Sequence, residues 1–178
     1  MSSAMSKKLL VVSDTHGCVA ALAAVFNWAK RIPPDAAVFL GDGIEDVEQA
    51  ASQSAFACPW YKVRGNGDWG ALAQDTAGFD FGGWRFFICH GHRHDVYNGK
   101  QTLAAAAATH GADAALFGHT HVPFWKNIAG VTLVNPGSLG RPRSSSGATF
   151  ALIECAPEEP LNVGLWRIDY AGTIRLLN

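Results

Sequence analysis

The chain has 178 residues, of which 48% are hydrophobic, and its formal net charge is −1. This length is enough for one domain with a buried core, and we expect a single domain over residues 1–178. A nearly neutral chain has no basic field to hold a polyanionic phosphate backbone, so dedicated nucleic-acid binding is disfavoured. No stretch reaches the roughly 18 uninterrupted apolar residues of a membrane span, so we expect no membrane association.

The N-terminal segment and the cysteines favour a cytoplasmic protein. Only four apolar residues follow Lys8, too few for the apolar region of a secretory signal. The four cysteines lie far apart and form no CxxC pair: Cys18, Cys58, Cys89 and Cys155. Separated cysteines of this kind are typical of reduced thiols in the cytosol.

Short apolar strands alternate with helices in the first half of the chain. The three strands are expected at Leu9–Val12, Ala36–Leu40 and Trp60–Arg64. Apolar residues at helical spacing predict a helix over Cys18–Arg31, which Pro33 and Pro34 end. A second helix begins in the acidic segment at Glu45. This alternation is typical of a parallel sheet.

The second half of the chain is expected to be richer in hairpins. Two are predicted, Phe79–Phe81 with Trp84–Cys89 and Phe124–Ile128 with Val131–Val134. Between them, Gln101–His110 is expected to form a helix and Ala112–Phe117 a strand. Turn residues separate three further strands, which indicate antiparallel sheet in the last third: Ala148–Glu154, Asn162–Asp169 and Thr173–Leu177.

Polar residues follow the predicted strands at the points where the strands end. They are Asp14, His16, Asp42, Asn66, His90, His119 and His121. Any one of them alone is explained as a turn residue or a helix cap. Together they are not, because histidine is not a turn residue, and ligands of open α/β sheets gather at the carboxyl ends of the strands. The set therefore predicts a metal site.

Seven ligands are too many for one tetrahedral ion and suit two ions about 3.5–4 Å apart, with a bridging carboxylate such as Asp42. Four imidazoles disfavour Mg²⁺ and Ca²⁺ and favour Mn²⁺, Fe²⁺, Zn²⁺, Ni²⁺ or Co²⁺. With only two carboxylates, a cluster of two divalent ions keeps a net positive charge. This charge favours an anionic phosphate ester as substrate.

In chain order, the motifs Asp14-x-His16, Gly41-Asp42, Gly65-Asn66, His90 and Gly118-His119-x-His121 resemble the signature of the calcineurin-like metallophosphoesterases. The short length and the Asn135-Pro136-Gly137-Ser138 segment resemble its small YfcE-like branch, which is related to the Vps29 scaffold proteins. The resemblance implies a mixed α/β fold, a four-layer α-β-β-α sandwich of two mixed sheets flanked by helices.

The resemblance also implies an activity and a ligand assignment. It places Asp14, His16, Asp42 and His121 on the first metal ion, and Asp42, Asn66, His90 and His119 on the second. A hydroxide that bridges two ions, with Mn²⁺ expected first, would attack phosphorus in line. The implied substrate is a small phosphodiester.

One position departs from the family pattern. Many relatives carry a histidine directly after the asparagine, where it protonates the leaving group, and this chain has Gly67. Without that acid we expect a preference for leaving groups of low pKa, and so for phosphodiesters, aryl ones above all. His92 is the candidate for a phosphate contact or substitute acid, and an exposed or supporting role is an equal alternative. Arg64 is expected to pair with Asp68.

Three alternatives to a phosphodiesterase remain open. A Vps29-like scaffold would bind protein partners, and self-association is also possible for a chain of this size. A phosphomonoesterase or phosphoprotein phosphatase would share the ligand set, whereas the neutral charge disfavours a nuclease. Strand tryptophans are expected in the core rather than on a partner surface: Trp60, Trp69, Trp84, Trp125 and Trp166. The loops at Trp69–Ala77, Arg93–Lys100 and Gly140–Gly147 carry no recognisable substrate code.

Overall fold

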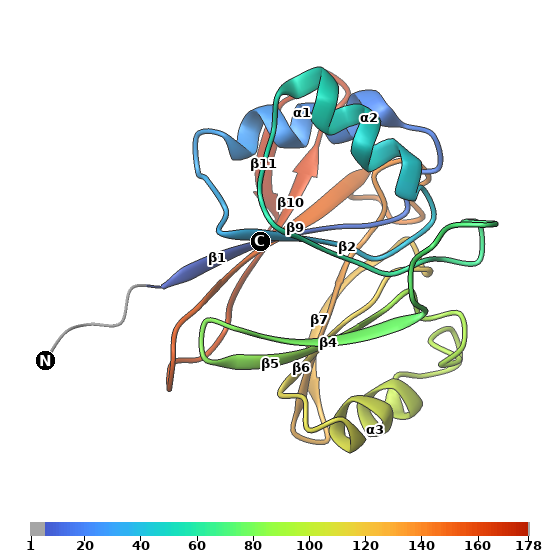
Figure 1. The fold of residues 1–178 in the computed structure, drawn as a ribbon, viewed down its shortest axis with the longest axis vertical. Coiled ribbons are helices and arrows are strands. Elements are labelled where there is room, and N and C mark those ends of the chain that lie inside the picture. Colours follow the sequence, from blue (N-terminus) through green and yellow to red (C-terminus); the bar gives the residue numbers. More distant parts are fainter. Residues whose placement is uncertain (1–5, 178) are drawn as a thin grey trace, which may run out of the picture.

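The computed structural model describes residues 6–177, so residues 1–5 and 178 of the predicted domain lie outside the described part. Two β-sheets pack face to face, and helices cover both outer faces (Figure 1). The predicted four-layer α-β-β-α sandwich is therefore confirmed.

The first sheet has six strands in the order β11-β10-β9-β1-β2-β3. Their bounds are β1 Lys7–Val12, β2 Ala36–Phe39, β3 Trp60–Lys62, β9 Ala148–Cys155, β10 Asn162–Ile168 and β11 Ile174–Leu177. The strands β1, β2 and β3 run parallel, whereas β9 pairs antiparallel with both β1 and β10. The parallel part brings the carboxyl ends of three consecutive strands to one edge.

The second sheet has five strands in the order β4-β5-β6-β8-β7. Their bounds are β4 Thr76–Phe81, β5 Trp84–Cys89, β6 Ala114–Leu116, β7 Pro123–Ile128 and β8 Val131–Pro136. The pairs β4–β5 and β7–β8 are the two predicted hairpins, while β5, β6 and β8 run parallel. This sheet is also mixed.

Helices α1 (Val19–Ala29) and α2 (Ile44–Ser54) cover the six-stranded sheet, and α3 (Gln101–Thr109) covers the five-stranded sheet. The apolar core follows these layers. In β1, Leu9 and Val11 face the second sheet, whereas Leu10 and Val12 face the helices. Because both faces of β1 are buried, its sequence is a continuous apolar run rather than an alternating one. Each such side chain contributes about 1.5–3 kcal/mol by leaving water.

The predicted elements are present, and their bounds differ from the predicted ones by at most three residues. Trp69 contradicts the expectation that the tryptophans are in the core, since it lies in a loop rather than a strand and is 92% exposed. Trp125 in β7 is also exposed at 51%. Among residues 6–177, no helix is long and apolar enough to cross a bilayer.

Candidate metal centre

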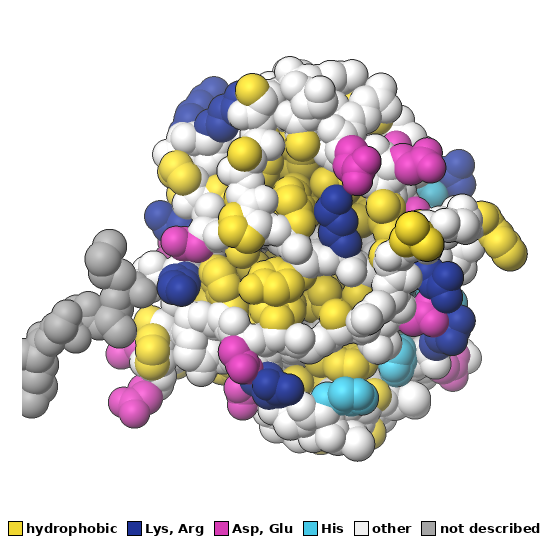
Figure 2. All heavy atoms as spheres, viewed as in Figure 1, with side chains coloured by type: hydrophobic (Ala, Val, Ile, Leu, Met, Phe, Trp, Pro, Cys, Tyr) yellow, Lys and Arg dark blue, Asp and Glu magenta, His cyan; other side chains and the backbone are white. Residues whose placement is uncertain are grey.

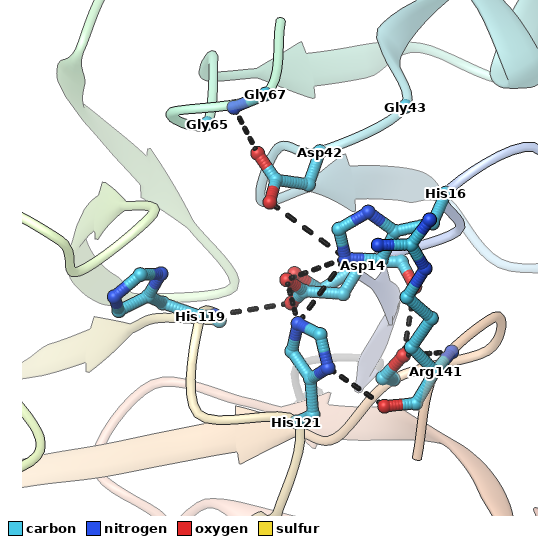
Figure 3. Close-up of polar contacts among 12 residues, drawn as sticks. Asp14, His16, Asp42, Gly43, Gly65, Gly67, His119, His121 and Arg141 are labelled. Atoms are coloured by element: carbon cyan, nitrogen blue, oxygen red, sulfur yellow. Dashed lines mark hydrogen bonds and ion pairs between the residues drawn. The ribbon is translucent and has the colours of Figure 1, made fainter.

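Six of the seven predicted ligands meet at the edge where the parallel strands of both sheets end. Asp14 and His16 follow β1 and Asp42 follows β2, all from the six-stranded sheet. The five-stranded sheet supplies the other three, namely His90 after β5 and His119 and His121 after β6. Figure 3 shows the side chains of Asp14, His16 and His121 pointing toward one another. Residues distant in sequence are therefore brought to one point between the two sheets.

The Asp14 carboxylate is fully buried, and its two oxygens have different environments. Oδ2 accepts hydrogen bonds from the Ser13 hydroxyl at 2.5 Å and from the His119 backbone N–H at 3.1 Å. Among the described residues, Oδ1 accepts no hydrogen bond of good geometry, although Nε2 of His121 lies 3.0 Å away. A buried carboxylate oxygen with so few donors around it is a suitable ligand for a cation.

Burial favours the protonated form of Asp14, yet other contacts outweigh it. The contact with His121, the charge of His90 and the hydroxyl of Ser13 hold the pKa of Asp14 below its usual value. The side chain is therefore an anion at neutral pH, as a metal ligand must be.

Backbone carbonyls fix the rings of His90 and His121. Nδ1 of His121 lies 2.7 Å from the Arg141 carbonyl oxygen, and Nδ1 of His90 lies 2.7 Å from the Leu40 carbonyl oxygen. Because a carbonyl only accepts, each Nδ1 must donate its N–H. In a neutral ring, Nε2 then presents its lone pair to the cluster, which is the orientation that supporting hydrogen bonds give to metal-binding histidines.

The two oxygens of the Asp42 carboxylate also have different environments, as those of Asp14 do. Its Oδ1 accepts the Gly67 backbone N–H at 2.7 Å. Its Oδ2 faces Nε2 of His90 at 3.5 Å and Nε2 of His16 at 3.7 Å. Asp42 thus contacts one histidine from each sheet, which fits its predicted role as the bridging carboxylate.

Ring nitrogens also meet one another directly. Nε2 of His16 lies 3.2 Å from Nε2 of His121, and Nδ1 of His119 lies 3.2 Å from Nε2 of His90. Burial and then the charge of His90 lower the pKa of His119 to about 4, and burial lowers the pKa of His16. One shared proton would pair only two ring nitrogens. A metal ion would accept a lone pair from every nitrogen directed at it.

Two groups of ligand atoms are close enough for a shared ion, Asp14 with His16 and His121, and Asp14 with Asp42 and His90. The donor set of carboxylate oxygens and imidazole nitrogens suits divalent transition metals. The residues therefore fit the metal centre that the sequence predicts.

Five of the predicted ligands have left-handed backbone conformations, which cost non-glycine residues about 1–3 kcal/mol each. They are Asp14, His16, Asp42, His119 and His121, with φ between +45° and +68°. Two glycines make the close packing here possible. A Cβ on Gly65 would collide with Oδ1 of Asp42, and one on Gly118 with the Ser13 hydroxyl. Strain gathered at one cluster is typical of functional sites.

The family model for the calcineurin-like phosphoesterase superfamily domain matches residues 8–158. The chain belongs to this superfamily. Membership implies divalent metal ions, and the donor set described above agrees with that implication.

Relatives and solved structures agree with this membership. A probable metallophosphoesterase of Mycoplasma pneumoniae is 32% identical over 140 residues, which cover 77% of this chain and 82% of that protein. Zinc-bound Vps29 of Entamoeba histolytica has a TM-score of 0.76 at 19% identity and covers 96% of this chain and 97% of its own. The phosphoesterase YfcE of E. coli has a TM-score of 0.68 at 21% identity, with coverages of 96% and 98%. The expected resemblance to the small YfcE and Vps29 branch is confirmed.

Asn66 and His92 lie beside the cluster of predicted ligands. Both line a hollow of about 300 Å³, together with Trp69 and Arg93. The His92 ring centroid lies 5.5 Å from that of His90, and burial followed by the charge of His90 lowers the pKa of His92. Asn66 is exposed, and its role as a ligand stays a prediction.

The expected pair between Arg64 and Asp68 is wrong. Arg64 instead donates to Asp75, with Nε 2.7 Å from Oδ1. Asp68 accepts four backbone N–H groups, from Asp42, Gly43, Ile44 and Gly65. Sequence reasoning missed this role. No local signal marks it, because three of the four N–H groups belong to residues 24 to 26 positions earlier in the chain.

Proposed function

We propose that this protein is a phosphodiesterase that uses two divalent transition-metal ions, with Mn²⁺ the first candidate. One observation carries the proposal. In Asp14 and in Asp42, one carboxylate oxygen accepts a backbone N–H group and the other faces histidine nitrogens. Ligand atoms prepared in this way support a metal centre rather than an ordinary buried polar cluster.

The ligand assignment follows the grouping of the side chains. Asp14, His16 and His121 would hold the first ion, and His90, His119 and Asn66 the second, with Asp42 shared. Two ions held by these residues would supply Lewis acidity and would neutralise charge on phosphoryl oxygens.

The chain's own groups orient the substrate. Asn66 and His92 line the hollow beside the cluster and are the groups that we place against the phosphate. Burial lowers the pKa of His92, so its ring is largely neutral at pH 7. It would contact the phosphate through an N–H hydrogen bond rather than as a cation. Gly67 supplies no acid for the leaving group, which favours diesters whose leaving group is stable as an anion.

The test compares bis(p-nitrophenyl) phosphate with p-nitrophenyl phosphate, using metal-stripped protein reconstituted with Mn²⁺. We expect faster turnover of the diester, and a loss of at least about a hundredfold in His119→Ala and Asn66→Ala. His110→Ala is the matched control, because His110 is an exposed histidine at the end of α3. Preference for the monoester would favour a phosphomonoesterase or phosphoprotein phosphatase instead.

The second candidate is a protein-binding scaffold, which the likeness to Vps29 favours. Absence of turnover with Mn²⁺, Ni²⁺, Co²⁺, Fe²⁺ and Zn²⁺, despite bound metal, would support the scaffold. The four free thiols suit a reducing cytoplasmic location, and a small phosphodiester remains the proposed partner of the site.

A further inference from the structure

The loop between β3 and β4 presents two large apolar side chains to solvent. Trp69 is 92% exposed and Leu72 is fully exposed. Figure 2 shows hydrophobic atoms that project from the right-hand edge of the molecule, where Figure 1 draws this loop. Single exposed apolar residues are ordinary, so the exposure of Trp69 gains meaning only from its position.

Charged groups hold the base of this loop firmly. Asp68 ties it to the backbone of Asp42 and of the first turn of α2. Arg64 donates to Asp75 across the loop, and its backbone N–H donates to the Gln74 carbonyl. Arg93 pairs with the same Asp75 at 3.1 Å. The residues beside Trp69 are therefore fixed to the metal centre.

Trp69 lies between two hollows that flank the proposed ligands. The first, of about 350 Å³, is lined by His16 and Asp42. The second, of about 300 Å³, is lined by Asn66 and His92. Trp69 lines both, and each hollow has the size of a small-ligand site. A phosphate ester that occupies either hollow would therefore lie next to Trp69.

We propose that Trp69 is a stacking platform for a planar aromatic group of the ester substrate, and so a specificity-determining residue. This inference rests on the proposed phosphoesterase function and names its substrate class. An indole face binds an aromatic ring by dispersion and quadrupole attraction, whereas a methyl group gains little from it. Aromatic stacking is typically worth several-fold to about a hundredfold in affinity.

Leu72 provides a matched control. It is as exposed as Trp69 and lies in the same loop, but it lines a different hollow with Glu48, Trp60 and Lys62. A general effect of apolar surface on this loop would appear in Leu72→Ala and Trp69→Ala alike. An effect of stacking beside the ligands would appear only in Trp69→Ala.

The experiment measures binding by calorimetry, so that it does not depend on turnover. Phenylphosphonate, cyclohexylphosphonate and methylphosphonate are titrated into Mn²⁺-loaded protein, namely wild type, Trp69→Ala, Trp69→Phe and Leu72→Ala. We expect phenylphosphonate to bind wild type about tenfold more tightly than either other probe. This affinity ratio should fall to about one in Trp69→Ala and should stay near ten in Trp69→Phe and Leu72→Ala. Adenosine 5′-monophosphate against ribose 5-phosphate then separates a nucleobase from a simple aryl group.

An unchanged preference for phenylphosphonate in Trp69→Ala would overturn the inference, and so would equal binding of the phenyl and cyclohexyl probes. In either case, binding of methylphosphonate would show that the metal site still binds a phosphonate group. Failure of wild type to bind any phosphonate would instead refute the phosphoesterase site itself. The two failures are thus distinguishable.

Discussion

The carboxylate of Asp68 accepts the backbone N–H of Asp42 at 2.7 Å, although the two residues are 26 positions apart. It also accepts the N–H groups of Gly43 and Ile44 at 2.7 and 3.0 Å. Gly43 is the N-cap of α2 and has no side chain to cap the helix. Asp68 therefore caps α2 from another loop and fixes the backbone of Asp42 at the same time.

Asp68→Ala should lower the free energy of unfolding by about 2–3 kcal/mol, because four partly buried N–H groups lose a charged acceptor. Urea denaturation of the metal-free protein measures this loss. Asp80→Ala, which removes only an exposed ion pair with Arg85, is the control and should remain close to wild type. Equal stability of Asp68→Ala and wild type would show that water replaces these hydrogen bonds.

Metal addition should stabilise the protein through the unpaired oxygen of Asp14. Mn²⁺ at about 100 times its dissociation constant adds about 2.7 kcal/mol, which corresponds to about 5–10 °C in Tm for a domain of this size. Asp14→Asn should lose this shift. Without metal, its Tm should also fall below that of wild type, because the contacts of Asp14 with His121, His90 and Ser13 favour its ionised form in the folded protein.

Thermal unfolding with and without a chelator tests both parts of this prediction, with His110→Ala as the control that keeps the full shift. A metal-free Asp14→Asn protein as stable as wild type would show that the contacts with His121, His90 and Ser13 do not favour the charged form of Asp14.

Cys89 should make stability depend on alkaline pH. Burial raises the pKa of its thiol to about 12. The unfolded chain releases this proton above about pH 8.5, whereas the folded protein retains it. The contribution of the thiol is thus complete below that pH and is lost as the pH rises toward 12, at up to about 1.4 kcal/mol per pH unit.

Urea denaturation at pH 7, 9 and 10.5 measures this effect as the difference between wild type and Cys89→Ala, which should shrink with pH. Phe87→Leu, in the same strand and the same apolar cluster, is the control whose difference from wild type should stay constant. A constant difference for Cys89→Ala would contradict the prediction.

Gly67→His should broaden the range of leaving groups. Gly67 is exposed, and a Cβ there would meet Oδ1 of Asp42 at 3.0 Å, so the Asp42 carboxylate must shift by a few tenths of an ångström. An imidazolium at this position would protonate an alkoxide, and general acids contribute about 10²–10⁴ to such steps. The ratio of glycerol 2-phosphate to bis(p-nitrophenyl) phosphate turnover should therefore rise at least about tenfold. Gly67→Gln adds bulk without an acid, and an equal rise there would exclude proton donation.

Much of the fold is legible in the sequence because its strands bury both faces. The run Leu9–Val12 predicts a central strand for that reason. The pairing of β1 with β9 is not legible, since the two strands are far apart in the chain and no local pattern specifies a partner. Short strands such as β3 end earlier than predicted because Arg64 leaves the sheet to pair with Asp75.

The metal centre, like the fold, could be predicted from the sequence only in part. Histidines after strands are conspicuous in the sequence, and six predicted ligands do meet in the structure. Their orienting partners include the carbonyls of Leu40 and Arg141, and every residue has a carbonyl, so no sequence signal marks these two. The place of Trp69 between two hollows depends on the path of a loop, which its composition does not specify.

The cluster draws its side chains from both sheets, so neither sheet alone holds a complete set. An ion bound by Asp14 and His121 would act as a removable cross-link that closes a loop of about a hundred residues. A folding chain would acquire such an ion only after its two halves have docked. Metal binding would then mark the last stage of folding. Removal of the metal would weaken the contact between the two sheets before either sheet unfolds.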